Sequence, residues 1–323
     1  MSVLSRPYFH DEAAAFTHVE GVLWPHGPEC RHCGSVDRAY PLKNVRSKPS
    51  KKNPQGVERH GLYKCRECRK QFTVRTGTIF EETHLPLHKW LQAIHLMSSS
   101  KKGISSHQLH RVLECTYKTA WFLAHRIREA MRSDDFTPMG GDGKIVEADE
   151  TYIGRLADVP KSKGTAHKNT VLTLVERGGR ARSFHVDNTS VARIVPIVNA
   201  NIAKESMLMT DEARHYKTVG QTFAFHGRVE HSKNEYGWTA PLDGGVKLKV
   251  NTNTVEGFYS IFKRGMKGVY QHCAEHHLHR YLAEFDFRYS NRAAMGVDDG
   301  VRSVVALMGA KGKRLTYRRP VAI

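Results

Sequence analysis

Three acidic residues occupy positions from which their side chains could meet in one site: Asp149, Asp211 and Glu256. Asp149 closes a predicted strand at 144–149, Asp211 closes a second at 207–211, and Glu256 lies in a predicted helix. Strands that alternate with helices form mixed α/β sheets, whose sites lie at the strand ends. Three carboxylates without a nearby thiolate select Mg²⁺ or Mn²⁺ over zinc, and two such ions support phosphoryl transfer. We therefore expect a two-metal site that acts on phosphodiesters.

The helix that carries Glu256 is predicted over residues 251–268. Lys263 and Lys267 share one face with Glu256, where Lys263 can orient a scissile phosphate and Lys267 can contact a DNA backbone. Asn253 and Glu256 also have the spacing of a capping box, which is the favoured interpretation of this stretch taken alone. The two acids upstream reverse that preference. The apolar residues recur at helical spacing and are expected to face the core: Val255, Phe258, Tyr259, Phe262 and Met266.

Two further residues lie near the predicted site. Glu147 shares the strand face of Asp149 at a spacing of two residues and could support the site, although a surface or hydrogen-bonding role is the simpler interpretation. Trp238 lies in residues 231–250, which carry little periodicity and are predicted to be a loop. This indole is a candidate for stacking on a splayed base, with packing as the simpler alternative.

Four of the six cysteines form two C-x-x-C pairs, which are separated by residues 34–64: Cys30, Cys33, Cys65 and Cys68. Each pair can sit on a tight knuckle, and two knuckles offer four thiolates to one tetrahedral zinc ion. Because four thiolates leave no open position, the predicted zinc is structural. The basic insert between the pairs includes Lys51 and Lys52, which are expected either to contact DNA phosphates or to be a solvated surface.

Residues 85–132 have a helical pattern. Pro86 can start a first helix, Ser105 or Ser106 can cap a second, and Thr116 can cap a third. Two helices joined by a short turn behind an introductory helix predict a helix-turn-helix, with an ordinary three-helix bundle as the alternative. The positions expected to be exposed near the major groove are Lys118, Thr119, His125 and Arg126.

The overall composition indicates a polyanionic partner. The 323 residues carry a formal charge of +18 and a pI near 9.7, and no apolar run is long enough for a membrane helix or a signal peptide. Nucleic acid is therefore the expected partner, and the cytoplasm is the expected compartment. The predicted divisions are a helical lead-in with zinc ribbon at 1–80, a helix-turn-helix region at 81–133, an α/β catalytic domain at 144–292 and a basic tail at 293–323.

The motifs in their order resemble a known family. V-E-A-D-E-T-Y-I-G around Asp149, M-T-D-E around Asp211, and N-T-N-T-V-E-G-F-Y-S-I-F-K-R-G through Glu256 follow a zinc ribbon and a helical region. This order resembles the DDE transposases of bacterial insertion sequences, in the zinc-ribbon-bearing branch that is related to Merlin elements (the "IS fifteen-ninety-five" family). The resemblance implies a ribonuclease H-like domain with a mixed sheet and two divalent metals, with these three acids as metal ligands and Lys263 as the family's accompanying lysine.

The same resemblance implies a transposase that binds the terminal inverted repeats of its element, cleaves the ends and joins them to target DNA. Because two ends need two active sites, we expect a homodimer or larger assembly on double-stranded DNA, associated with the bacterial nucleoid. Two alternatives stay open: a nuclease or resolvase on the same ribonuclease H-like core, and a non-catalytic DNA-binding regulator.

Overall fold

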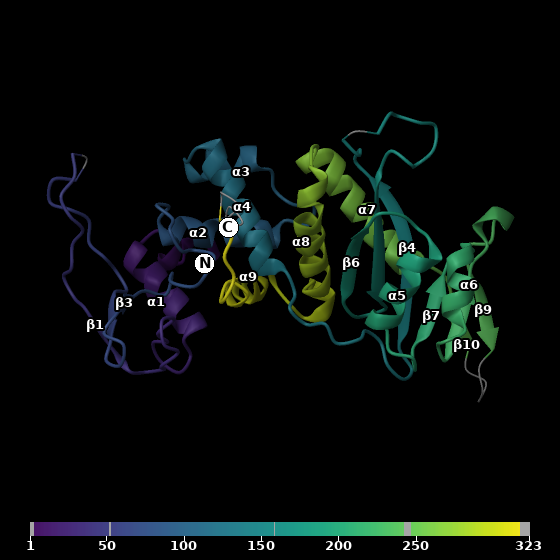
Figure 1. Cartoon of the computed structure of the whole chain (residues 1–323), viewed down its shortest axis with the longest axis horizontal. Coiled ribbons are helices and arrows are strands. Elements are labelled where there is room, and N and C mark those ends of the chain that lie inside the picture. The colour runs from purple at the N-terminus through teal and green to yellow at the C-terminus, as the bar shows by residue number, and fades with distance from the viewer. Residues whose placement is uncertain (1–2, 52, 158, 242–246, 317–323) are drawn as a thin grey trace. The chain divides into compact units, whose positions relative to one another are not determined.

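The computed structural model describes residues 3–51, 53–157, 159–241 and 247–316 (Figure 1). The chain divides into two compact units. The first comprises residues 1–100, 104–131 and 298–323, and the second comprises residues 101–103 and 132–297. Within the described ranges, no helix is long and apolar enough to cross a membrane.

The first unit begins with a helix and a small ribbon. Helix α1 (Glu12–Leu23) follows two short 3₁₀ turns, and three short antiparallel strands pair in the order β1-β2-β3: β1 (Ala39–Pro41), β2 (Tyr63–Cys65) and β3 (Gln71–Phe72). Trp24, which ends α1, makes edge contacts with the rings of Tyr63 and Phe72 at centroid distances of 5.6 and 5.8 Å. Because Trp24 and Phe72 are both buried, these aromatic contacts give the ribbon a core that its short strands could not supply.

The rest of the first unit is helical: α2 (Leu87–Ser99), α3 (Ser106–Leu113), α4 (Tyr117–Met131) and α9 (Asp299–Met308). The three predicted helix starts are confirmed: α2 begins directly after Pro86, Ser105 Oγ accepts a hydrogen bond from Gln108 N, and Thr116 Oγ1 accepts one from Thr119 N. Helix α9 is a correction, because the sequence predicted only a basic tail at 293–323. It packs against α2, where Arg302 donates to the carbonyl of Ser98 at 3.1 Å.

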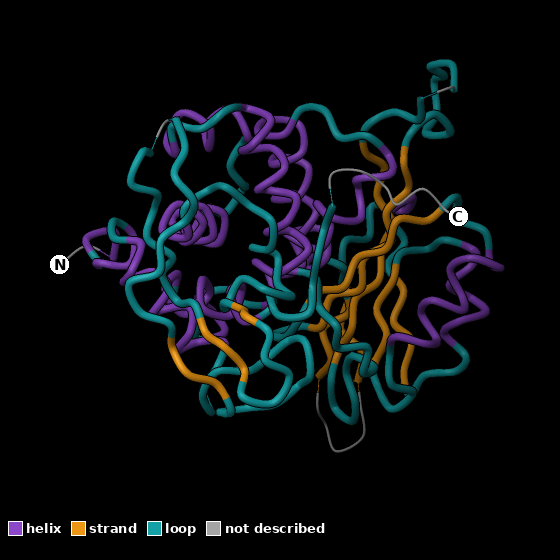
Figure 2. Tube along the Cα trace, turned by 60° about the vertical axis from the view of Figure 1, so that its left-hand side comes forward, coloured by secondary structure: helices purple, strands orange, loops and turns teal. Residues whose placement is uncertain are grey.

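The second unit is built on a mixed five-stranded sheet: β4 (Ile145–Ile153), β5 (Asn169–Glu176), β6 (Ala181–Val186), β7 (Met207–Thr210) and β8 (Phe225–Arg228). The spatial order is β6-β5-β4-β7-β8, with antiparallel pairing from β4 through β6 and parallel pairing from β4 through β8. Figure 2 shows these strands side by side. This is the mixed sheet of a ribonuclease H-like domain, as the sequence predicted.

Helices cover both faces of this sheet: α5 (Val191–Asn201), α6 (Arg214–Gly220), α7 (Asn253–Gly265) and α8 (Leu278–Ser290). The side chains of β5 alternate between the two faces. Leu172 and Leu174 pack in a core with residues of α5 and α6, whereas Val171 and Val175 pack in a core with residues of α7 and α8. All residues of β5 except Glu176 are therefore buried, because neither face of the strand is exposed to water.

The stretch predicted to be a loop at 231–250 contains ordered structure. A 3₁₀ turn (His231–Lys233) precedes a hairpin of β9 (Trp238–Pro241) and β10 (Lys247–Val250). Ala240, Leu248 and Val250 are buried against Met209 and Val229 of the main sheet region. Strand β10 alternates between exposed lysines and buried apolar residues, but each strand has only four residues and β9 does not alternate, so the sequence pattern was too short to predict the hairpin. The remaining short elements are 3₁₀ turns at Glu275–His277 and Ala293–Met295 and a π turn at Met266–Tyr270.

Candidate active site

Asp149 lies in the middle of β4, which corrects the prediction that it ends a strand. The strand continues to Ile153 because β5 pairs with it along its whole length, with Thr173 opposite Asp149. Asp149 Oδ1 accepts a hydrogen bond from Glu150 N at 2.8 Å. The hydroxyl of Tyr259 donates to the Asp149 carbonyl at 2.6 Å, so α7 is fastened directly to the backbone of this acid.

Asp211 directly follows the last residue of β7. Strands β7 and β4 are parallel, with Met209 paired to Glu147. Counted two residues on from this pair, Asp211 and Asp149 occupy corresponding positions along the two parallel strands. Asp211 Oδ1 also accepts a hydrogen bond from Ala213 N at 3.0 Å, which fixes the turn into α6.

Glu256 lies in the first turn of α7 and its side chain is about half exposed, at 49%. Its Oε1 accepts a hydrogen bond from Thr252 Oγ1 at 2.7 Å, and the Nε2 atom of His231 lies 3.6 Å from the same oxygen. The apolar face predicted for this helix is confirmed, because all five of its residues are buried in one core: Val255, Phe258, Tyr259, Phe262 and Met266. The opposite face, with Glu256, is left for the site.

Neighbouring carboxylates act electrostatically on Asp149 and Asp211. Burial, followed by the neighbouring carboxylates of Glu150, Asp211 and Glu256, raises the pKa of Asp149 to about 7. Burial is also the largest cause of a raised pKa at Asp211, with a further contribution from Glu150. The fold therefore collects negative charge that a divalent cation would stabilise, and its ligand atoms are the oxygens that Mg²⁺ prefers. Among the described residues, only the four cysteines form a group of potential metal ligands whose atoms all lie within 4.8 Å of one another, so the acids are more widely spaced than that.

The N-terminus of α7 is capped by Glu147, a residue 107 positions earlier in the chain. Glu147 is fully buried; its Oε2 accepts from the backbone N atoms of Thr254 and Val255 at 2.7 and 2.9 Å, and its Oε1 accepts from Thr254 Oγ1 at 2.8 Å. The capping box between Asn253 and Glu256 does not form. Because another carboxylate satisfies the helix end, the carboxylate of Glu256 is not needed there.

Arg177, in the turn between β5 and β6, holds Glu147 in place. Its Nε donates to Glu147 Oε1 at 2.6 Å, while Nη1 donates to the Lys249 carbonyl at 2.7 Å and Nη2 to the carbonyl of Asn251 at 2.8 Å. We call Glu147 and Arg177 the α7 clamp. The spacing of two residues from Asp149 pointed to Glu147, but no sequence signal pointed to Arg177. The clamp joins β4, β10 and the start of α7, and so fixes the turn that carries Glu256.

Glu150 faces the other side of the sheet from Glu147. Its Oε1 accepts from the hydroxyl of Tyr216 at 2.5 Å and lies 2.9 Å from the Nε2 atom of His215, both in α6. This contact fastens α6 to β4 next to Asp149. The partners of Glu150 in α6, His215 and Tyr216, carry no recognisable motif in the sequence.

Of the two lysines predicted to share a face with Glu256, Lys263 lies in α7 and Lys267 lies beyond its end. The Nζ atom of Lys263 is 5.8 Å from the centroid of the Tyr259 ring, whose hydroxyl contacts Asp149. Lys267 is exposed in the π turn that follows the helix. Gly265, the last residue of α7, has no room for a side chain, because a Cβ atom there would come within 2.6 Å of the Lys102 carbonyl and 2.5 Å of the Phe285 ring.

The residues predicted to bind DNA in the first unit have mixed outcomes. Lys118 and Thr119 are exposed in the first turn of α4, and Lys51 is exposed in the ribbon insert, whereas Lys52 lies outside the described residues. The prediction that His125 is exposed is wrong, because its side chain is 1% exposed and packs on the Trp121 ring at 4.1 Å.

Arg126 is a second correction, because only 4% of its surface is exposed. Its Nη2 donates to the Glu81 carbonyl at 2.6 Å, and its guanidinium lies over the rings of Trp90 and Phe122. The second half of α4 is enclosed because α2 and α9 both pack against this helix. The polar character of His125 and Arg126 therefore did not indicate an exposed face of α4.

The four predicted zinc ligands converge in the ribbon. Cys30 and Cys68 have Sγ atoms 3.6 Å apart, and those of Cys33 and Cys65 are 3.7 Å apart. Four sulfurs at about 2.3 Å from a tetrahedral zinc are about 3.8 Å from one another, so the cluster has the dimensions of a zinc site. The four-cysteine ribbon supports structural zinc, as predicted.

Comparison with known proteins agrees with this architecture. Residues 140–290 match the ISXO2-like transposase domain, and residues 10–71 match the transposase zinc-ribbon domain. A protein of Halobacterium salinarum, described as an uncharacterized protein in transposable element ISH50, is 26% identical over 257 residues, which cover 72% of this chain and 82% of that protein. The chain therefore contains the zinc-ribbon domain and, after it, the transposase domain of the zinc-ribbon-bearing DDE transposases from insertion sequences.

Proposed function

We propose that this chain is a catalytically active transposase, which binds the terminal inverted repeats of its element, cleaves the ends and joins them to target DNA. The observation that supports the proposal most is the position of Asp149 in β4 beside Asp211, which follows the parallel strand β7, together with a pKa of Asp149 that burial raises most and the carboxylates of Glu150, Asp211 and Glu256 raise further. Such a cluster is costly for the fold unless it binds cations. Its location in a chain of formal charge +18 supports a polyanionic substrate.

In this proposal, Asp149, Asp211 and Glu256 hold two Mg²⁺ or Mn²⁺ ions. When bound, these ions activate the attacking oxygen and stabilise the leaving oxygen. The protein's own groups position the DNA. Lys263 provides a point charge for the scissile phosphate, and the α7 clamp keeps Glu256 aligned with the two aspartates.

DNA binding is assigned to exposed lysines on both units and to the exposed hydroxyl group of Thr119. Lys118, Thr119 and Lys51 contact the terminal repeats, and Lys267 contacts the backbone beside the site. Because two element ends are processed, the working form on DNA is a homodimer or a larger assembly. The reaction takes place in the cytoplasm on nucleoid DNA.

The test is cleavage of a labelled duplex that carries the element's own ends, with Mg²⁺, by the wild type and by Glu256→Gln. We expect cleavage by the wild type and loss of cleavage in the variant, with DNA binding retained. Equal cleavage by both proteins would remove Glu256 from the site. A second reaction with pre-cleaved ends distinguishes a transposase, which joins them to target DNA, from a nuclease or resolvase, which does not. Binding that survives chelation, without cleavage under any divalent metal, would instead indicate a regulator.

A further inference from the structure

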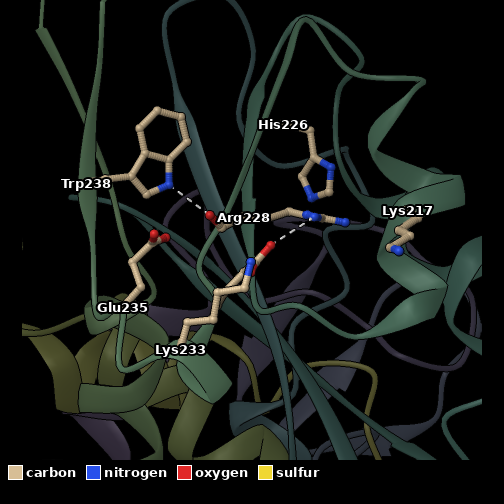
Figure 3. A pocket seen from close by; sticks show the side chains of 7 residues that line it. Lys217, His226, Arg228, Lys233, Glu235 and Trp238 are labelled. Atoms are coloured by element: carbon tan, nitrogen blue, oxygen red, sulfur yellow. Dashed lines mark hydrogen bonds and ion pairs between the residues drawn. The ribbon is translucent and has the colours of Figure 1, made fainter.

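The catalytic unit contains a polar pocket of about 470 Å³ that none of the assigned roles uses (Figure 3). Its lining consists of three cationic side chains, two carboxylates, one imidazole and one indole. These residues are Lys217, Arg228, Lys233, Glu230, Glu235, His226 and Trp238. The volume lies within the range of about 300–1,000 Å³ that is typical of sites for small molecules or single nucleotides.

The indole is exposed yet held in a fixed orientation. Trp238 begins β9 and is 39% exposed, and its Nε1 donates to the Arg228 carbonyl at 2.9 Å. Figure 3 shows this ring on one side of the pocket, with Lys217 on the other. A rigid aromatic ring that faces solvent can stack on a base at little cost in side-chain entropy.

The cations of the pocket interact mainly with the carboxylate of Glu230. Glu230 pairs with Arg228 at 3.5 Å and also with Lys233. Lys233 lowers the pKa of this acid most, and the charges of Arg228 and Lys217 lower it further. His226 is uncharged at neutral pH, because burial and then Arg228 lower its pKa to about 4. With Glu235 included, three positive charges face two negative ones. The pocket therefore has a net positive charge and suits an anion that carries hydrogen-bonding groups.

Two contacts link the pocket to the neighbourhood of Glu256 and Asp211. The turn that supplies Glu230 and Lys233 also carries His231, whose Nε2 lies 3.6 Å from Glu256 Oε1. At the back of the pocket, His226 Nε2 lies 2.9 Å from Thr210 Oγ1, and Thr210 directly precedes Asp211. A DNA strand with its scissile phosphate at the acids would therefore pass close to Trp238.

We infer that this pocket receives one unstacked nucleotide of the DNA substrate, with its base on Trp238 and its phosphate near Lys217 and Arg228. The inference rests on the proposed function, because it places a strand at the acids. A paired base in a duplex keeps both faces stacked, so only a nucleotide from an opened end or a single strand presents a face to the indole.

The first experiment measures binding of fluorescein-labelled single-stranded pentathymidine to the full chain, without divalent metal, by fluorescence anisotropy. Trp238→Ala is expected to weaken binding by about 5- to 150-fold, the range that one base–aromatic stack provides. Trp238→Phe, which keeps a stacking face, is expected to bind nearly as the wild type does. Phe136→Ala is the matched control, because Phe136 is a 78% exposed aromatic residue of the same unit outside the pocket.

The cation half of the pocket is tested in the same way. Lys217→Ala is expected to weaken binding, and Lys144→Ala, which removes an exposed lysine outside the pocket, is not. Photo-cross-linking of the same oligonucleotide with one 5-iodouracil is expected to modify Trp238. Loss of affinity in Lys217→Ala alone, with cross-links elsewhere, would indicate a phosphate site without a base and would overturn the inference.

Cleavage of the element's ends by the same wild-type preparation separates this inference from the proposed function. Normal cleavage, together with equal oligonucleotide binding by Trp238→Ala and Phe136→Ala, would refute nucleotide binding in the pocket and would leave the proposed transposase activity supported. Absence of wild-type cleavage would refute the proposed function, while the binding and cross-linking results would still decide whether Trp238 holds a base.

Discussion

Substitution of the α7 clamp should separate the alignment of Glu256 from the stability of the fold. Glu147 accepts three hydrogen bonds from the start of α7 and one from Arg177, and it is fully buried. Glu147→Ala would leave the Arg177 charge without its carboxylate partner, which typically costs about 3–5 kcal/mol. Glu147→Gln keeps the shape but offers a single acceptor oxygen, so we expect a loss of about 1–3 kcal/mol in the free energy of unfolding.

The consequence for function follows from the position of Glu256, next to Val255, whose backbone N is bonded to Glu147. When the helix end loosens, the carboxylate of Glu256 is less well aligned with the two aspartates. We therefore expect Glu147→Gln to raise the Mg²⁺ concentration that gives half-maximal cleavage by about 10-fold or more, the scale seen when groups that orient metal ligands are removed. Affinity for the uncleaved ends in Ca²⁺ is expected to stay unchanged.

The matched control is Glu284→Gln. Glu284 is also fully buried in the second unit, where it pairs with Arg288 and accepts a hydrogen bond from Tyr270 at 2.5 Å. Its replacement should lower the denaturant midpoint in a comparable way, but should not change the Mg²⁺ requirement. If both variants need the same Mg²⁺ concentration as the wild type, Glu147 contributes only to the stability of the fold and does not align Glu256.

Three further predictions concern other parts of the chain. Lys118→Ala should weaken binding to the element's ends and reduce the salt dependence of that binding by about one counterion, as measured by titrations at two salt concentrations. Arg126→Ala should instead lower the melting temperature in thermal unfolding, because Arg126 is buried against aromatic rings. Cys30→Ser should lose zinc, as measured by atomic absorption, and expose the ribbon to protease. Burial raises the pKa of Asp286 from 3.8 to about 7, so this carboxyl group favours the folded state at low pH and that contribution is lost as pH rises towards 7. The unfolding free energy of Asp286→Asn relative to the wild type should therefore increase between pH 5 and pH 8 in urea titrations; an unchanged difference would place the ionisation elsewhere.

Local signals in the sequence were sufficient for several features. The two C-x-x-C pairs predicted the zinc ribbon, because each knuckle is closed within a few residues of its own cysteines. Ser105 and Thr116 predicted helix starts, because a cap bonds only to the next turn. The apolar face of α7 followed from its own periodicity, and the three acids could be chosen because they stand in recognisable motifs.

The tertiary structure decided what depends on residues far apart in the sequence. Strand β4 runs past Asp149 because β5 pairs with it, and pairing is not encoded within the strand itself. His125 and Arg126 are buried because helices from elsewhere in the chain enclose the second half of α4. The spacing of Asn253 and Glu256 suited a local cap, but Glu147 supplies the cap from 107 residues away and so leaves Glu256 to the site. A short pattern reports which contacts a segment can make, and only the packing of distant segments determines which of them form.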